Sequence, residues 1–440
     1  MTLQSSNLVD QFADHYGGLK PQLPGAGLGW LGQLRDDGMA AFQASGMPTA
    51  KAEDWRYTNL RAMTKSVFQP AGADGVPASV AVDSGAAHRL VFVNGLFRPD
   101  LSHAGDLPAG ARLSPLSQAL EDRPDLLEPH LGRLLSTEDA SLVALNMAMM
   151  RDGFVLHLGP GVRVDDPIEM LFISSAAAGA VHFHPRGLIL LEEGCAATVV
   201  EDHVGQSGSY FSNCATEIDI ATAASLRHYK LQDEALDAFH THATIAKLGH
   251  DARYESFVLS VGAALSRHEI RVALAGEGAA CRLDGAYLAA GGQQVTNRTL
   301  VNHLAPAASS SQVYKGVLDD RAQAAFLGTI KVWPDAQLTD GHQLNKAILL
   351  SDKAEIDTKP ELLIHADDVK CSHGATAGEL DGDALFYLRS RGIAEAAARA
   401  MLIEAFLADV IEHISFSVVR DAYRERAAAW MTGRARENEQ

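Results

Sequence analysis

The pattern of apolar and polar residues changes twice along this chain of 440 residues. Apolar residues recur at helical spacing near the N-terminus, as at Leu8, Phe12 and Tyr16. Between residues 154 and 364, short segments rich in apolar residues follow one another without a long helical period. The helical period returns after Gly392. The pattern therefore predicts a mainly β protein with helical regions at both ends, divided at residues 1–150, 151–385 and 386–440.

The central strands are expected to form a solenoid. Three similar segments, beginning at Leu226, Tyr254 and Arg282, are evenly spaced, and turns rich in Gly, Ala, Asp or Asn separate the strands. Regular repetition of this kind is typical of coils that stack on one another and bury a continuous core. A β-sandwich would also contain many short strands, but so long an unbroken series favours the solenoid.

The terminal regions give more local predictions. Residues 89–97 are expected to form a hairpin with Asn94–Gly95 as its turn. The glycines of residues 27–32 have the spacing of a dinucleotide motif, but a Pro-rich loop precedes them, so we interpret them as a turn entering a helix. Near the C-terminus one long helix is expected, with an apolar stripe that its own domain or a partner must cover. The stripe consists of Met401, Leu402, Ile403, Phe406, Leu407, Val410, Ile411 and Ile414.

Charge and cysteine content narrow the range of functions. The net charge of −18 argues against binding to nucleic acid or to anionic membranes, both of which need basic surfaces. No apolar run is long enough to span a bilayer, and residues 1–18 lack the features of a signal peptide, so a cytoplasmic protein is expected. The four cysteines, Cys195, Cys214, Cys281 and Cys371, have no CxxC spacing and are expected to be free thiols. Any iron or sulfur would therefore be held transiently, or with ligands from a partner.

Candidate metal ligands occur at alternating positions in predicted strands. Cys371 and His373 would share one strand face, where a thiol and an imidazole could reach the same metal ion. The alternative is a buried structural thiol beside a surface histidine. Two further pairs, His182 with His184 and His240 with His242, also alternate. A metal site needs three or four converging groups, so we interpret these pairs as part of a solvated solenoid face.

The common catalytic motifs are missing from the sequence. There is no GxxxxGK(S/T) phosphate loop, no GxSxG nucleophile turn and no HExxH zinc helix. The carboxylates are numerous, but their spacing along the sequence identifies no catalytic pair. The residues alone therefore favour a scaffold over a self-sufficient catalyst.

Four segments carry a resemblance to a known family. Residues 54–59 (DWRYTN), 144–153, 371–376 and 386–393 together resemble the SufB/SufD family of iron–sulfur cluster assembly proteins. SufB-type members carry a cysteine where this chain has Leu388, and an EHEA-like segment where it has residues 371–375. The chain is therefore similar to the SufD-type branch.

The resemblance implies a fold and an assembly. It implies a right-handed parallel β-helix between helical regions, in a cytoplasmic complex with one SufB and two copies of the ATPase SufC. SufB would pair with this chain through the β-helix, and ATP hydrolysis would take place in SufC rather than in this scaffold chain. The C-terminal helical region would dock SufC or support that docking, through Met401, Phe406, Leu407 and Val410.

The resemblance also implies a site. His373 is expected to be an iron ligand or a contributor to a nascent iron–sulfur cluster at the SufB interface, with Cys371 as a second candidate. The cluster would be transient, with none stably bound to this chain alone. Three alternatives stay open: a polysaccharide-active β-helix enzyme, a homomeric cluster scaffold that acts alone, and a homodimer that forms when SufB is absent.

Overall fold

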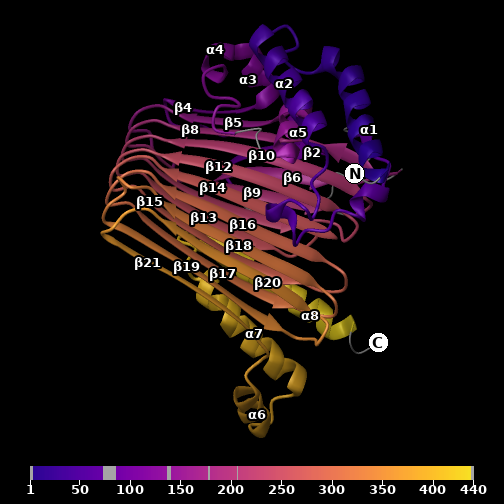
Figure 1. Cartoon of the computed structure of the whole chain (residues 1–440), viewed down its shortest axis with the longest axis vertical. Coiled ribbons are helices and arrows are strands. Elements are labelled where there is room, and N and C mark those ends of the chain that lie inside the picture. Colours follow the sequence, from indigo (N-terminus) through magenta and orange to yellow (C-terminus); the bar gives the residue numbers. More distant parts are fainter. Residues whose placement is uncertain (1–2, 73–85, 136–139, 177–178, 206, 438–440) are drawn as a thin grey trace.

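The computed structural model (Figure 1) describes residues 3–72, 86–135, 140–176, 179–205 and 207–437. Two long sheets form the walls of a solenoid, and helices lie at its two ends and along its outer faces. None of the helices in these ranges is long and apolar enough to cross a membrane.

One wall of the solenoid is an 11-stranded sheet, here called sheet A. Its main path runs from β20 through the even-numbered strands to β8, β5 and β4, and the short strands β1 and β7 pair beside it. The strands are β1 (Gln69–Pro70), β4 (Ala111–Pro115), β5 (Gly153–Leu158), β7 (Val181–Phe183), β8 (Arg186–Leu191), β10 (Tyr210–Ile220), β12 (Phe239–Leu248), β14 (Leu265–Leu274), β16 (Gln294–His303), β18 (Gln323–Val332) and β20 (Glu355–Ile364).

The opposite wall is a 10-stranded sheet, here called sheet B, which begins at β21 and ends at β2 and β3. Its strands are β2 (His88–Val93), β3 (Leu96–Phe97), β6 (Ile168–Ser174), β9 (Ala196–Gly205), β11 (Ser225–Asp233), β13 (Arg253–Ser260), β15 (Ala280–Ala289), β17 (Ser309–Leu318), β19 (Thr339–Leu349) and β21 (Val369–Gly378).

The connectivity confirms the predicted solenoid. From β8 onward each strand pairs in parallel with the strand two places later, so the chain alternates between the two sheets as it winds. Leu226 lies opposite Tyr254, and Tyr254 lies opposite Cys281, one residue before the predicted repeat position Arg282. The even spacing in the sequence is therefore the length of one coil. The fold is a parallel β-helix.

The interior of the solenoid has an apolar half and a polar half. The apolar half contains stacked side chains such as Ile218, Leu226, Leu248 and Val272. The polar half lies where the ends of β9 and β11 meet the beginnings of β10, β12 and β14. Its buried side chains are Glu201, His203, Cys214, His228, Lys230, Gln232, Glu234, His240, His242 and His268.

The N-terminal helices cover one end and part of the outer face of sheet A (Figure 1). Leu8, Phe12 and Tyr16 are buried in the contact between the helices and β10, β12 and β14, as their helical spacing predicted. These helices are α1 (Leu3–Leu19), α2 (Gly29–Ser45), α3 (Leu116–Asp122), α4 (Pro124–Leu127) and α5 (Ser141–Met149), with short 3-10 turns at Lys20–Gln22, Glu53–Trp55, Met63–Lys65 and Pro99–Leu101. Helix α2 begins at Gly29, so the glycine-rich segment is a turn entering a helix.

The hairpin prediction is confirmed. Strands β2 and β3 are antiparallel, and Asn94 and Gly95 at their turn have φ values of 49° and 75°. Positive φ at both positions is typical of the tight turns that join twisted hairpin strands.

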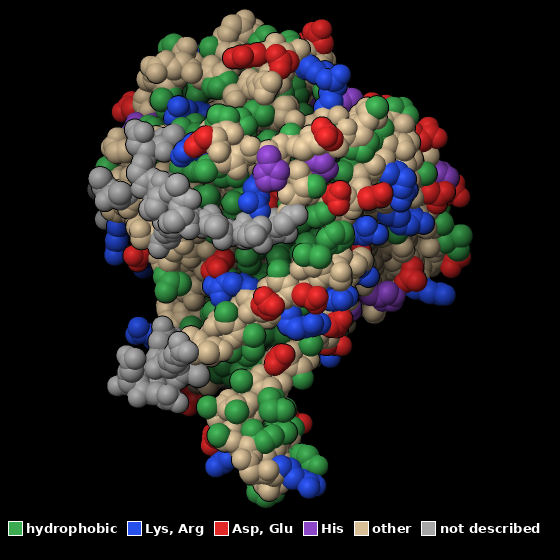
Figure 2. All heavy atoms as spheres, turned by 180° about the vertical axis from the view of Figure 1, so that it is seen from behind, with side chains coloured by type: hydrophobic (Ala, Val, Ile, Leu, Met, Phe, Trp, Pro, Cys, Tyr) green, Lys and Arg blue, Asp and Glu red, His purple; other side chains and the backbone are tan. Residues whose placement is uncertain are grey.

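The C-terminal region is three helices rather than the one long helix that the sequence predicted. They are α6 (Gly382–Ser390), α7 (Glu395–Ile411) and α8 (Ser417–Glu437). Gly392 separates the first two with a φ of 86°, a conformation in which the helix cannot continue. Helices α7 and α8 pack on the outer face of sheet B, whereas α6 projects beyond the last coil (Figures 1 and 2).

Candidate functional site

Cys371 and His373 lie on β21, the terminal strand of sheet B. Val369 and Cys371 pack against the last apolar cluster of the interior, which includes Ile330 and Val332. Because strand side chains alternate, His373 lies on the same face as these two residues. The prediction of a shared face is therefore confirmed, and that face is the inward face of the last coil.

The two side chains differ in exposure. Cys371 is half-buried, and burial raises the pKa of its thiol above the usual range. It is therefore a neutral thiol at physiological pH, which makes it a weaker metal ligand than a thiolate. His373 is exposed, because in the described part of the chain no further coil stacks over β21. Its one strand neighbour there is β19, where Gln343 lies opposite it.

β20 is the terminal strand of sheet A, and it lies at the same end of the solenoid as β21 (Figure 1). None of the residues of β20 is buried, whereas β16, β17, β18 and β19 each contain several buried residues. Both sheets therefore end here with a strand that has a neighbour on one side only. Such edges present backbone N–H and C=O groups that can pair with another chain.

His373 and Cys371 do not form a complete metal site by themselves. Among the residues that the structure describes, the groups of three or more converging His, Cys, Asp or Glu ligands lie elsewhere, inside the polar half of the solenoid. His373 and Cys371 belong to neither of these groups.

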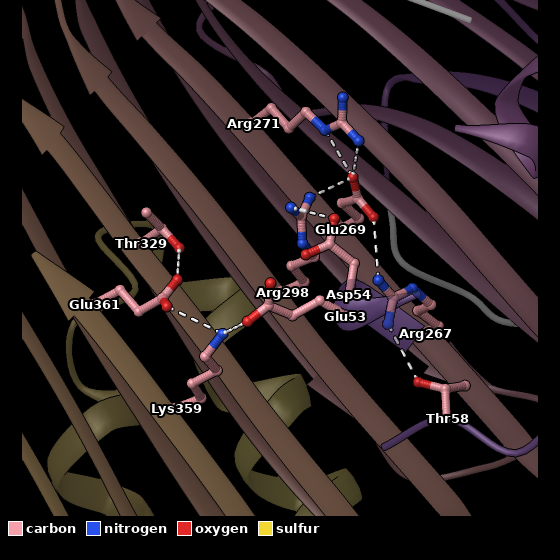
Figure 3. A network of polar contacts seen from close by, with 10 residues as sticks. All are labelled: Glu53, Asp54, Thr58, Arg267, Glu269, Arg271, Arg298, Thr329, Lys359 and Glu361. Carbon is pink, nitrogen blue, oxygen red and sulfur yellow. Dashed lines mark hydrogen bonds and ion pairs between the residues drawn. The ribbon is translucent and has the colours of Figure 1, made fainter. Parts of the chain in front are cut away.

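The segment at residues 53–58 forms an ion network on the outer face of sheet A (Figure 3). Arg298 Nη2 lies 2.7 Å from Asp54 Oδ2, and the guanidinium of Arg267 lies 4.0 Å above the centre of the Trp55 ring. Glu269 joins both arginines, because its carboxylate also contacts each of them. The segment begins with a short 3-10 turn, Glu53–Trp55, which packs on the sheet.

The same network reaches the last coil. Lys359 on β20 contacts Glu53 on one side and Glu361 on the other, with 3.0 Å between Lys359 Nζ and Glu361 Oε1 (Figure 3). The N-terminal segment thus contacts the edge strand next to the open end. Sequence reasoning missed these contacts, because nothing in the local pattern indicates which strands residues 53–58 cross.

The segment at residues 144–153, which also carries the family resemblance, makes structural contacts as well. Asn146 on α5 is fully buried and donates from Nδ2 to the carbonyl oxygens of Pro185 and Asn213, each at 2.8 Å. Its Oδ1 accepts from Arg186, which also lies 2.7 Å from Glu217. The segment at residues 144–153 therefore joins the N-terminal helices to the first coils.

The expected SufC-docking residues divide into two groups. Leu407 and Val410 are buried against the outer face of sheet B, in the cluster that contains Leu288 and Val317. Phe406 is half-buried beneath Lys315, whose Nζ lies 4.6 Å from its ring centre. Met401 is exposed. The apolar stripe is thus covered largely by sheet B of this chain. Leu407 and Val410 are placed to support the C-terminal helices rather than to contact another protein.

The interpretation of the histidine pairs as a solvated face is wrong. His182, His184, His240 and His242 are all buried, and the two rings of each pair lie within 6.1 Å of each other. Both faces of β12 are covered, one by the interior and the other by the N-terminal helices. His240 and His242 face the interior of the solenoid, whereas His182 and His184 pack against Phe12 of the N-terminal helices. Alternation could not show that either face is covered.

Comparison with known proteins identifies the family. The family model described as "SUF system FeS cluster assembly, SufBD core domain" matches residues 172–406, and the "SufBD protein N-terminal region" matches residues 6–170. The chain belongs to the SufBD family.

SufBD relatives match nearly the whole chain. It is 32% identical over 400 residues to the iron–sulfur cluster assembly protein SufD of Escherichia coli, covering 89% of this chain and 91% of that protein. A SufBD family protein of Synechocystis is 32% identical over 394 residues, with 86% of each chain covered. SufD of Bacillus subtilis is 25% identical over 407 residues, covering 89% of this chain and 92% of that protein. The chain is a SufD-like member of an iron–sulfur cluster assembly family, so the polysaccharide-enzyme alternative is set aside.

Proposed function

We propose that this SufD-like chain is a scaffold subunit that pairs with SufB through the open end of its β-helix. The supporting observation is that β20 and β21, the terminal strands of both sheets, lie together at that end with exposed side chains and a free edge. Pairing there would continue both sheets and cover the apolar groups of the last coil.

His373 is the proposed contribution of this chain to the nascent iron–sulfur cluster. It is exposed at the pairing edge, and an imidazole is a suitable ligand for ferrous iron. The remaining ligands would come from SufB, because the described residues around His373 supply no further group of ligands. Cys371 is the second candidate, and its partial burial places it behind His373 in this role. The cluster is a transient cargo of the assembled complex.

The C-terminal helical region is the proposed contact for SufC, where ATP hydrolysis would take place. Helix α6 projects from the body of the protein, with Phe386 75% and Tyr387 57% exposed (Figure 2). Met401 on α7 adds a third exposed apolar side chain. An exposed apolar group on a projecting element is a typical feature of a protein-binding surface.

The test is co-expression of the chain with SufB and SufC, comparing the wild type with His373→Ala. We expect the complex to assemble in both cases, and its iron and sulfide content to fall in the variant. His365→Ala is a matched control, since His365 is also exposed and lies in the turn between β20 and β21. Unchanged cluster content in His373→Ala would contradict the site. Failure of the wild type to form the complex would contradict the pairing, and cluster formation by the chain alone would support the homomeric scaffold.

A further inference from the structure

Three side chains in the polar half of the solenoid converge far from the open end. One ligand atom each of His203 on β9, Cys214 on β10 and His240 on β12 lies within 4.8 Å of the other two. All three side chains are buried. A tetrahedral Zn²⁺ site with these ligand types has bonds of about 2.0–2.3 Å, so small side-chain rotations would bring the three atoms onto one ion.

His240 has the features of a ligand that lacks its ion. Its side chain is fully buried, and within the described residues its Nε2 has no hydrogen-bond partner. Its Nδ1 lies 2.7 Å from Glu234 Oε2. Metal-bound histidines commonly contact a carboxylate through the nitrogen that does not hold the metal. An unpaired buried nitrogen is costly, and a bound ion would remove that cost.

His203 has a carboxylate neighbour as well. Its Nε2 lies 3.3 Å from Oε2 of Glu201, which is buried beside it. A carboxylate in this position can orient a ligating imidazole.

A second group of ligands, Glu201, His203 and His242, shares His203 with the first group. Both ring nitrogens of His242 are already engaged, since Nδ1 contacts Lys230 Nζ and Nε2 lies 3.0 Å from Thr216 Oγ1. The group that contains Cys214 is therefore the better site.

We propose that His203, Cys214 and His240 bind one divalent transition-metal ion of borderline softness, Zn²⁺ or Fe²⁺, inside the β-helix, and that Glu234 positions His240. Two imidazoles and a thiolate suit such ions better than hard ions such as Mg²⁺. The Cys214 thiol gives up its proton to solvent as the metal–sulfur bond forms, with no change of oxidation state. This inference does not depend on the function proposed for His373.

The test uses Co²⁺ as an optical substitute for Zn²⁺ and Fe²⁺. The full chain is freed of metal and titrated anaerobically with Co²⁺, both when folded and during refolding from urea, because the site is buried. We expect a thiolate-to-cobalt charge-transfer band that saturates at one Co²⁺ per chain. Zn²⁺ and Fe²⁺ are then added separately, and the ion that removes the band at the lower concentration is the preferred one. The absence of the band under both loading conditions would overturn the proposal.

Variants assign the band to this site. Cys214→Ser is expected to abolish it, whereas Cys281→Ser, which alters another buried thiol of the interior, should leave it unchanged. Glu234→Gln should weaken Co²⁺ binding about 10-fold or more while retaining the band. Circular dichroism shows whether each variant folds, and if Cys214→Ser does not, His240→Gln provides the same test. A band that survives in folded Cys214→Ser but disappears in Cys371→Ser would overturn the proposal and place the ion at the open end.

Discussion

Arg298 on β16 and Glu269 on β14 lie directly opposite each other in the parallel ladder, with 2.8 Å between Nη1 and Oε1. Arg298 also contacts Asp54, so one guanidinium joins two neighbouring coils to the N-terminal segment (Figure 3). Glu269 is surrounded by Arg267, Arg271 and Arg298, which hold its pKa at about 2 despite burial.

We expect Glu269→Gln to lower the free energy of unfolding by up to about 3.5 kcal/mol at pH 7, since each unit of pKa shift corresponds to about 1.4 kcal/mol. The pKa of Glu269 in the folded protein lies below the 4.5 of a free glutamate side chain, so the stabilisation is fully present above pH 4.5. It is lost as the pH falls from there toward 2. Urea unfolding at several pH values measures the difference between variant and wild type. The exposed Glu404→Gln is the control, and a difference that stays constant down to pH 3 would contradict the argument.

The buried pair of Arg186 and Glu217 gives a second prediction. Both side chains are fully buried, and Glu217 also accepts hydrogen bonds from the backbone N–H groups of Gly132 and Leu134. Arg186→Met would leave this carboxylate buried without its cation, so we expect a loss of about 3–5 kcal/mol in the free energy of unfolding. Arg399→Met removes an exposed pair with Glu395 and should cost less than about 1 kcal/mol in the same urea experiment. Equal losses of unfolding free energy in Arg186→Met and Arg399→Met would show that burial of the ion pair does not determine the loss.

Two glycines of sheet B make room for tyrosine rings. On β15 and β17, Gly285 lies opposite Tyr314, and Tyr287 lies opposite Gly316. A Cβ atom at Gly316 would lie 2.0 Å from the Tyr287 ring, and one at Gly285 would lie 2.6 Å from the Tyr314 ring. We expect Gly316→Ala to lower the free energy of unfolding by about 1–3 kcal/mol, and with it the thermal unfolding midpoint. Gly292→Ala, where a Cβ would meet no atom within 4 Å, should leave the midpoint nearly unchanged. An unaltered midpoint in Gly316→Ala would mean that the ring moves away at little cost.

The two halves of the C-terminal stripe should respond differently to substitution. Leu407 is 1% exposed in the contact between α7 and sheet B, so Leu407→Ala should cost about 2–5 kcal/mol of stability. Met401 is 47% exposed, so Met401→Ala should leave stability unchanged and weaken binding to SufC. Thermal unfolding of the free chain and a pull-down with SufC separate the two effects. Normal SufC binding by Met401→Ala, together with Phe386→Ala and Tyr387→Ala, would move the proposed contact away from this surface.

Most secondary structure was predictable because its signals are local. The hairpin at Asn94–Gly95 depends on two adjacent residues that accept positive φ. The solenoid depends on a spacing that repeats along the chain, and Leu226 and Tyr254 do lie in register on neighbouring coils. The helical period after Gly392 was predicted, but the interruption of that helix between α7 and α8 was missed, because residues 412–416 contain no glycine or proline to signal a break.

The sites were predictable only in part. Alternation placed Cys371 near His373 because both lie on one strand. The meeting of His203, Cys214 and His240 depends on the register of three strands in two sheets, which no local pattern contains. The burial of His240 and His242 could not be predicted from alternation, because the residues between and beside them are buried too and the strand shows no polar, exposed face there.

The amino-acid sequence by itself determined the coil length, the placement of strands and helices, and the membership of the SufBD family, because each depends on residues close together in the chain. Only the tertiary structure decided which side of a strand is internal and which distant groups meet. Asp54 and Arg298 are separated by 244 residues, and the winding of the β-helix brings them together. Such contacts follow from the stacking order of whole coils, and stacking is a property of the folded chain.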